Sequence, residues 1–299
     1  MSSSNRKPLL AALVTVVLWA FAFPASKAVL PYFSAEQVVL LRYLVACLFY
    51  MVLFVFGLFP TPKWRDLPLI FVLGLLGVTV YQLLFVYGIG RVAAGAAAMI
   101  ITANPIFASL LARIFLGERL SHRAWWGIAI SLAGVVLITF GKGTEGEFTG
   151  YLMLVIAVFS ISIYFVFQKP FFTRYTPLSM TSYTSIAGTL PLLYFLPEAV
   201  TIVIAAPPSA LISIAVMGTF SSGIGFLLWF YALSKLPAGT VTSFLFLQPV
   251  VVTVMAWVWL HEMPSGMAFI GGAIILAGVA LVLLPQKQAR IGTTDEQDQ

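Results

Sequence analysis

Two basic side chains, Lys27 and Arg42, lie inside long apolar stretches of the chain. A charged group within a bilayer costs at least about 2.5–3.5 kcal/mol on insertion scales, so each invites a functional explanation. They can attract a substrate carboxylate, or they can form a gate with Glu36. The alternative is that these long side chains reach the membrane interface and anchor their helices. Both hypotheses stand for Lys27, whereas anchoring is the preferred interpretation for Arg42 and for Arg113.

Acidic side chains are missing from the middle third of every apolar stretch, although the chain contains 10 Asp and Glu. Carboxylates and histidines are the usual proton carriers of coupled transporters. This pattern argues against a carboxylate-based proton antiporter and favours a facilitator or an exchanger, while a Na⁺ site built from backbone carbonyls stays open.

The middle of the apolar stretches carries aromatic and neutral polar side chains instead. We predict that a central cavity is lined by Trp19, Tyr81, Gln82, Met99, Ser160, Tyr164, Trp229, Ser243 and Gln248, with Thr102, Ser221 and Ser222 close by. Hydrocarbon offers no hydrogen-bond partner to such groups, so they face other helices or a wet cavity. Hydrogen bonding between helices, worth about 0.6 kcal/mol on average, is the alternative to cavity lining. Aromatic rings beside hydroxyls and amides suit an amphipathic solute of amino-acid size.

Proline and glycine mark candidate hinges within the same stretches. They are Pro24, Pro105, Gly223, Gly225 and Pro249. Proline removes a helical hydrogen bond and bends a helix, although proline in membrane helices is also common without motion.

Other chemistries find little support. His261 and Glu262 begin like the zinc motif H-E-x-x-H, but Ser265 stands where the second histidine is needed. The sequence contains no G-x-x-x-x-G-K-[ST] nucleotide loop and no ring of charges or selectivity loop of the kind that channels use. We therefore predict no metal and no cofactor, and an intramembrane enzyme or a channel is disfavoured.

The composition places these residues in a membrane protein. The chain of 299 residues is 61% hydrophobic and 9% charged, against about 25% charged in ordinary globular domains. Apolar runs of helical length recur, and a bilayer core needs roughly 20 such residues. We predict an all-α membrane protein with ten transmembrane helices, at about 9–30, 36–58, 67–90, 93–117, 122–140, 150–169, 177–197, 211–234, 238–260 and 264–284.

The basic residues between the spans are distributed unevenly, which predicts an orientation. With the N-terminus in the cytoplasm, eleven of the 16 Lys and Arg are cytoplasmic: Arg6, Lys7, Lys63, Arg65, Arg119, Arg123, Lys169, Arg174, Lys235, Lys287 and Arg290. The opposite side has only Arg91 and Lys142. This positive-inside bias predicts that both termini are cytoplasmic, and the net charge of +6 is not the footprint of a nucleic-acid partner.

A duplication organises the chain, because residues 74–137 align without a gap on residues 218–281. Among the matches, Pro105 falls on Pro249 and Ala133-Gly134-Val135 falls on Ala277-Gly278-Val279. Each repeat has five spans, so the second must enter the membrane upside down, as in many secondary transporters. We predict a first repeat over 1–140, an inter-repeat loop over 141–149, a second repeat over 150–284 and a disordered cytoplasmic tail over 285–299.

Glycines seven residues apart recur in both repeats, as Gly127 and Gly134 and as Gly271 and Gly278. Small residues allow helices to approach closely. We predict close helix packing at these glycines, with a dimer face as the alternative, so the chain is expected to be a monomer or a homodimer.

Several motifs resemble the drug/metabolite transporter superfamily, in its ten-helix EamA-like exporter branch. The run WAFAFPASK over residues 19–27 resembles the first-helix signature, although Ala20 stands where glycine is usual. Arg42 resembles the arginine of the second helix, and the endings after Gly117-Glu118 and after His261-Glu262 resemble the repeat ending. The resemblance covers nearly the whole chain. It implies ten helices in an inverted repeat and export of small metabolites or amino acids across the bacterial inner membrane.

Together these observations predict a secondary-type transporter in the bacterial inner (plasma) membrane. It exports small metabolites, most of all amino acids including aromatic ones, by alternating access through a central cavity. Its partners are the small-molecule substrate and the lipid bilayer. Export of drugs, nucleobases or sugars stays open as the alternative.

Overall fold

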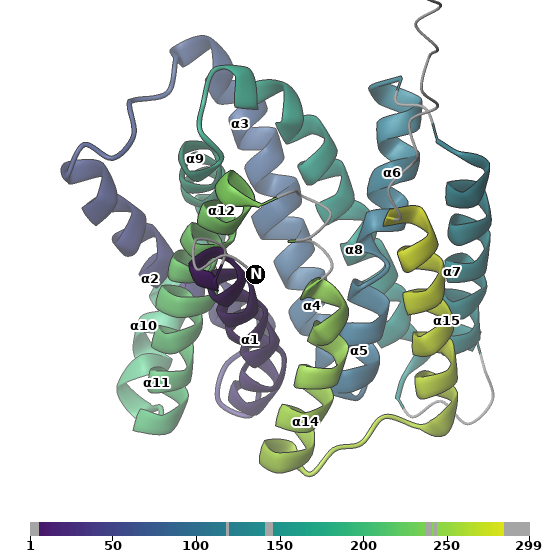
Figure 1. Ribbon diagram of the computed structural model, residues 1–299. Coiled ribbons are helices and arrows are strands. Elements are labelled where there is room, and N and C mark those ends of the chain that lie inside the picture. The colour runs from purple at the N-terminus through teal and green to yellow at the C-terminus, as the bar shows by residue number, and fades with distance from the viewer. Residues whose placement is uncertain (1–5, 118–119, 141–145, 237–240, 242–243, 284–299) are drawn as a thin grey trace, which may run out of the picture.

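The protein, seen in a computed structural model that describes residues 6–117, 120–140, 146–236, 241 and 244–283, is helical nearly throughout these ranges (Figure 1). The elements of the first half are α1 (Arg6–Val29), α2 (Ala35–Val55), η2 (Trp64–Asp66), α3 (Leu67–Gly74), η3 (Leu75–Val80), α4 (Tyr81–Ile89), α5 (Ala94–Ile101), α6 (Asn104–Phe115) and α7 (His122–Phe140). Those of the second half are α8 (Phe148–Gln168), η4 (Lys169–Thr173), α9 (Pro177–Thr189), η5 (Pro191–Phe195), α10 (Leu196–Ala205), α11 (Pro208–Val216), η6 (Met217–Ile224), α12 (Gly225–Lys235), η7 (Phe244–Leu247), α14 (Gln248–Leu260) and α15 (Gly266–Leu283).

These elements join into segments that can cross a membrane. Within the described residues, 8 are long and apolar enough: Arg6–Val29, Ala35–Val55, Trp64–Ile89, Ala94–Phe115, His122–Phe140, Phe148–Thr173, Pro177–Ala205 and Pro208–Ala232. Two shorter apolar helices, Phe244–Leu260 and Gly266–Leu281, lie where the last two spans are expected. The described part of the chain is thus nearly all-helical and compatible with the expected ten helices. The predicted tail, residues 285–299, lies wholly outside the described residues, as do residues 141–145 of the inter-repeat loop.

The equivalent prolines of the two repeats occupy equivalent breaks. Pro105 lies in the first turn of α6, just after α5 ends, and Pro249 lies in the first turn of α14, just after η7. A proline costs nothing in a first turn, because the N–H that it lacks has no helical partner there. Pro24, in contrast, is buried inside the continuous helix α1. The breaks are consistent with hinges, and hinge motion stays a prediction.

Two π-helices, η3 and η6, also occupy equivalent positions, since an offset of 144 residues carries η3 into η6. Gly223 lies inside η6 and Gly225 directly follows it. The wider turns of a π-helix displace carbonyl groups from regular helical bonding. Side chains of other helices bind these carbonyls: Ser160 Oγ donates to Leu76 O over 2.8 Å, and Trp19 Nε1 donates to Ser221 O over 3.0 Å.

Helices α7 and α15 lie side by side at one edge of the bundle (Figure 1). A Cβ atom added at Gly134 would lie only 2.7 Å from the carbonyl oxygen of Gly271, so the backbones are in contact there. Ser131 Oγ donates to the carbonyl of Ile275 over 3.0 Å across the same contact. The predicted close packing at the glycine pairs is therefore confirmed within the chain.

Candidate functional site

Arg42 is buried at the contact between the two halves. Its side chain leaves α2 after the second turn and is 6% exposed. Nε donates to Ser222 Oγ of η6 over 2.8 Å, and Nη1 donates to Gln82 Oε1 of α4 over 3.3 Å. The preferred expectation, that Arg42 reaches the membrane interface as an anchor, is wrong, because polar side chains within the bundle hold the guanidinium group.

A shell of neutral polar groups surrounds this guanidinium. Gln82 Nε2 donates to the Tyr43 hydroxyl over 2.9 Å, which fixes the amide so that its oxygen faces Arg42. Tyr50 OH donates to the carbonyl of Ser222. We call Arg42, Tyr43, Tyr50, Gln82 and Ser222 the Arg42 cluster. All five are buried, and they come from α2, α4 and η6.

Local sequence features place the Arg42 cluster. Ser34 and Gln37 form a capping box that fixes the start of α2, so the register of Arg42 along the helix is set. Gly218 in η6 lets the π-helix approach α2, since a Cβ there would lie 2.6 Å from the Arg42 carbonyl oxygen. A Cβ atom at position 218 would also lie 2.6 Å from the Cβ of Val45, so a larger residue here requires η6 and α2 to move apart.

Two of the predicted cavity residues, Trp19 and Trp229, form an aromatic cluster between α1 and α12. Their ring centroids are 5.1 Å apart, and Phe226 lies 5.2 Å from Trp19. Trp19 is half-buried and its indole nitrogen is bound to Ser221 O, while Ser221 Oγ donates to Leu18 O over 2.6 Å. Through its hydrogen bond to Ser221, this cluster contacts the η6 segment that also contains Ser222.

Tyr164 and Ser160 lie on α8 against the other π-helix. Tyr164 OH shares a 3.0 Å hydrogen bond with Thr184 and accepts one from Gln168, and Ser160 binds η3. Both side chains therefore form hydrogen bonds between helices, which was the alternative to lining the cavity. Tyr81, at the start of α4, is half-buried, and its ring lies 6.1 Å from that of Phe85.

The remaining predicted cavity residues are scattered. Met99 is buried and packs closely against Gly272, and Thr102 Oγ1 donates back to Ala98 O over 2.7 Å. Gln248 is half-buried at the start of α14. Ser243 lies outside the described residues.

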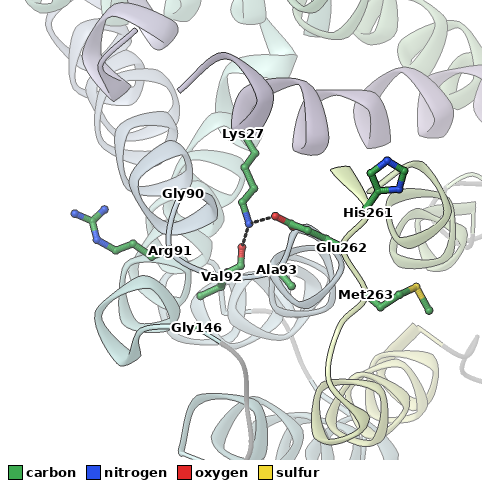
Figure 2. A pocket seen from close by; sticks show the side chains of 9 residues that line it. All are labelled: Lys27, Gly90, Arg91, Val92, Ala93, Gly146, His261, Glu262 and Met263. Carbon is green, nitrogen blue, oxygen red and sulfur yellow. Dashed lines mark hydrogen bonds and ion pairs between the residues drawn. The ribbon is translucent and has the colours of Figure 1, made fainter. Parts of the chain in front are cut away.

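Lys27 forms an ion pair at the end of the bundle where α1 ends (Figure 2). Its Nζ lies 2.6 Å from Glu262 Oε1 and donates to the carbonyl of Val92 over 2.9 Å. Glu262 Oε2 accepts a 3.4 Å hydrogen bond from the Ala94 amide. The expected partner, Glu36, instead accepts a hydrogen bond from Tyr87. The predicted pairing of Lys27 with Glu36 is therefore wrong, and Glu262 is the partner.

The ion pair borders a surface pocket of about 510 Å³ that Arg91, Gly146 and His261 also line (Figure 2). Lys27 and Glu262 are 22% and 28% exposed, so water reaches the pair. The pair connects α1 and the linker before α5, in the first half, to the linker before α15 in the second half. The sequence did mark Glu262 as a residue of interest, because the repeat aligns it with Glu118.

A second ionic cluster joins the halves at the segment between α2 and α3. Arg174 Nη1 lies 3.0 Å from Asp66 Oδ1, and Tyr175 OH donates to Asp66 Oδ2 over 2.7 Å. Burial is the main cause that raises the pKa of the Tyr175 hydroxyl above its usual value, and the Asp66 carboxylate raises it further. The hydroxyl thus stays protonated at neutral pH and keeps donating. This cluster was not predicted from the sequence, because Asp66 and Arg174 are 108 residues apart in the chain.

The other basic side chains of the spans are exposed. Arg113 lies near the end of α6 and Lys169 follows α8, both at the surface of the molecule. For Arg113 this agrees with the preferred interpretation of an interfacial anchor. Among the described residues, no group of three His, Cys, Asp or Glu gathers in a way that holds a metal ion.

Comparisons with known proteins agree with this architecture. The profile of the EamA-like transporter family matches residues 6–140 and again residues 148–284. The chain is 36% identical over 280 residues to a protein of Streptantibioticus cattleyicolor named as a probable terminal-alkyne amino-acid exporter, covering 92% of this chain and 93% of that protein. It is 34% identical over 268 residues to the uncharacterized transporter YdfC of Bacillus subtilis, covering 89% and 88%.

A solved crystal structure shares the fold. It superposes with a TM-score of 0.63 at 19% sequence identity and covers 94% of this chain and 99% of its own. At that identity the likeness concerns the fold alone.

Proposed function

Because the chain belongs to the EamA-like transporter family, we propose that it exports small metabolites, above all amino acids including aromatic ones, by alternating access through a central cavity. The family and the named relatives make the chain a membrane transporter and not an enzyme. The proposal adds the substrate class, the direction and the mechanism.

The observation that carries the mechanism is the ion pair between Lys27 and Glu262. Alternating access needs contacts between the two halves that close one side of the membrane and can be broken. A partly exposed ion pair of this kind is worth only about 0–1 kcal/mol, which is suitable for a contact that must open in each cycle. In the predicted topology, the pair lies on the extracytoplasmic side, so we assign it the role of a gate there.

The inverted repeat is the second part of the proposal. It is supported by the charge bias between the spans, by the two successive family matches and by the equivalent positions of η3 and η6. Two similar halves of opposite orientation give two conformations of similar energy, one open to each side. Both termini are then cytoplasmic in the bacterial inner membrane.

The choice of amino acids as substrates rests on the interior and on one relative. The Trp19–Trp229 cluster offers aromatic faces, and the Arg42 cluster offers hydroxyl, amide and cationic groups; the two clusters contact η6 at the adjacent residues Ser221 and Ser222. These groups suit an amphipathic solute, and one relative is named as a probable amino-acid exporter. Drug, nucleobase or sugar export is the alternative substrate class.

Counterflow in liposomes tests the proposal. Vesicles containing the purified protein are loaded with unlabelled amino acids, and the entry of labelled Trp, Phe, Met and Thr is followed. We expect saturable, protein-dependent accumulation that persists without a proton or sodium gradient. Lack of counterflow for every amino acid, with saturable counterflow of a nucleobase, sugar or drug, would overturn the substrate assignment.

A further inference from the structure

The guanidinium of Arg42 is a buried charge that forms no ion pair with any carboxylate of the described residues. Its hydrogen-bond partners, Ser222 and Gln82, are both neutral. The ion pairs given by the described residues use Lys27, Arg91 and Arg174 as cations, not Arg42. A buried charge without a partner of opposite charge is strongly unfavourable.

The sequence itself cannot supply the missing anion at this depth. Its acidic residues are Glu36, Asp66, Glu118, Glu145, Glu147, Glu198, Glu262, Asp295, Glu296 and Asp298. None lies within 67–117, 148–197 or 199–261, the ranges that contain α4 and η6. Glu36, on the same helix as Arg42, is engaged with Tyr87.

The N–H groups of Arg42 that donate to no described residue lie on the two terminal nitrogens of the guanidinium, Nη1 and Nη2. A guanidinium group has five N–H donors, and the contacts with Ser222 and Gln82 occupy one on Nε and one on Nη1. In the described part of the chain, Nη2 makes no hydrogen bond. One donor on Nη1 and two on Nη2 therefore remain, which is the edge that binds a carboxylate with two parallel hydrogen bonds.

The surroundings of the guanidinium suit a bound organic acid. The guanidinium lies over the ring of Tyr43, 5.8 Å from the ring centroid, and the Tyr43 hydroxyl accepts a hydrogen bond from the Gln82 amide that contacts Arg42. The Gln82 amide and the Ser222 hydroxyl hold it from two sides, so its orientation is fixed before any ligand arrives. Tyr81 is half-buried, whereas Gln82 and Ser222, the two side chains that orient the Arg42 guanidinium, are buried.

We propose that Arg42 is the binding residue for the carboxylate of the transported molecule, which supplies the missing negative charge. This inference rests on the proposed function and deepens it, because it restricts the substrates to compounds with a free carboxylate. Since Ser222 belongs to the second half and Arg42 to the first, a carboxylate bound here contacts the junction that moves in alternating access.

A carboxylate fits this position better than a halide ion. The guanidinium fork is planar and matches two oxygens of one planar group, whereas a spherical ion uses the fork less well. A chloride ion also has no apolar part that could pack against the neighbouring tyrosine rings. Binding of chloride at Arg42 is therefore the alternative that the test must distinguish from binding of a carboxylate.

The first test uses the unmodified protein and matched competitors. Counterflow of labelled L-phenylalanine is inhibited with unlabelled L-phenylalanine, with 3-phenylpropionate and with L-phenylalaninamide, in buffers of chloride and of methanesulfonate. We expect both acids to compete at a concentration at least about tenfold lower than the amide. Exchange of chloride for methanesulfonate should change nothing. Equal competition by the amide, or dependence on chloride, overturns the proposal.

The second test compares Arg42→Gln with Arg113→Gln. Both variants remove one arginine charge, but Arg113 is exposed near a helix end and serves as the matched control. We expect Arg42→Gln to lose the preference for the acid over the amide, and Arg113→Gln to keep it. Arg42→Lys, which retains charge but lacks the fork, should show an intermediate preference. Retention of the full preference in Arg42→Gln contradicts the assignment.

A binding measurement separates this proposal from the proposed function and does not require the variants to fold. The thermal unfolding of the wild-type protein in detergent is followed with 3-phenylpropionate, L-phenylalanine or the amide. If no amino acid shows counterflow but the acids alone raise Tm, the substrate class fails and the Arg42 assignment stands. If amino acids are transported while acids and amide raise Tm equally, only the Arg42 assignment fails.

Discussion

Lys27 Nζ lies 2.6 Å from Glu262 Oε1, and this ion pair connects the end of α1 to the linker that precedes α15. The same ammonium group donates to the Val92 carbonyl, so three segments meet at one side chain. If the pair is a gate, its removal has a measurable consequence for access to this end of the protein.

The first prediction concerns Glu262→Gln. Loss of the ion pair removes roughly 1 kcal/mol from the closed arrangement, so we expect the open form to become about fivefold more populated. The measurement uses a cysteine at Ala93, with Cys47 replaced by serine, and a membrane-impermeant thiol reagent. Labelling should be about fivefold faster in Glu262→Gln.

The control for this gate is Glu147→Gln. Glu147 pairs with Arg91 at the same end of the bundle, but its side chain is 65% exposed, so its loss should leave the labelling rate unchanged. The exchanged pair Lys27→Glu with Glu262→Lys should restore slow labelling only in part, because it places a carboxylate against the Val92 carbonyl and an ammonium group against the Ala94 amide. Equal labelling rates in Glu262→Gln and in the parent protein would show that the pair does not hold this end closed.

The second prediction concerns Trp19, which bonds to a carbonyl of η6. Trp19→Phe keeps an aromatic ring beside Trp229 but removes the donor to Ser221 O. We expect a loss of about 1 kcal/mol in the free energy of unfolding, measured as a lower Tm in detergent. Trp126→Phe is the control, because Trp126 is 69% exposed and its replacement should leave Tm nearly unchanged. Identical effects of the two changes would mean that the carbonyl of the π-helix does not need the indole donor.

Local features of the fold could be predicted from the sequence, whereas contacts between distant segments, such as the one that buries Arg42, could not. Apolar runs located the helices, and Pro105 and Pro249 mark breaks between them, whereas Pro24 lies inside a continuous helix. The glycine pairs predicted close helix packing, because close approach requires small residues, but only the structure shows that α7 and α15 pack against each other. The burial of Arg42 was not predicted, since its stabilising partner Ser222 lies in another half of the chain and only the folded bundle brings them together.

The π-helices were equally hidden, because an apolar segment has the same composition in an α-helix and in a π-helix. Their role in helix contacts became visible only through the side chains that bind their carbonyls, such as Ser160 at Leu76. The partner of Lys27 was missed for a related reason. Glu36 is near in sequence, but α2 places it beside Tyr87, whereas the α14–α15 linker brings Glu262 to α1.

The third prediction concerns the Asp66 cluster. Tyr175→Phe removes the donor to Asp66 Oδ2 and the acceptor of the Lys63 amide, which are 2.7 Å and 2.9 Å hydrogen bonds. We expect the free energy of unfolding to fall by about 1–3 kcal/mol, because the Asp66 carboxylate is largely buried. Thermal unfolding checks this, with Tyr194→Phe as the control because Tyr194 is 84% exposed. A Tm equal to that of the parent protein would mean that Arg174 alone satisfies Asp66.

The fourth prediction concerns the contact between α7 and α15. Gly134→Ala places a methyl group 2.7 Å from the Gly271 carbonyl oxygen, and that atom belongs to the backbone and cannot move aside alone. Overpacking of this kind costs about 1–3 kcal/mol, so Tm should fall and the yield of folded protein should decrease. The matched control is Gly266→Ala at the start of α15, where an added Cβ meets nothing within 4 Å. If both variants unfold at the parental Tm, the two helices have room to separate at this point, and the glycines serve another purpose. A lower Tm in Gly134→Ala alone would show that helix contact inside one chain, rather than a dimer face, requires glycine here.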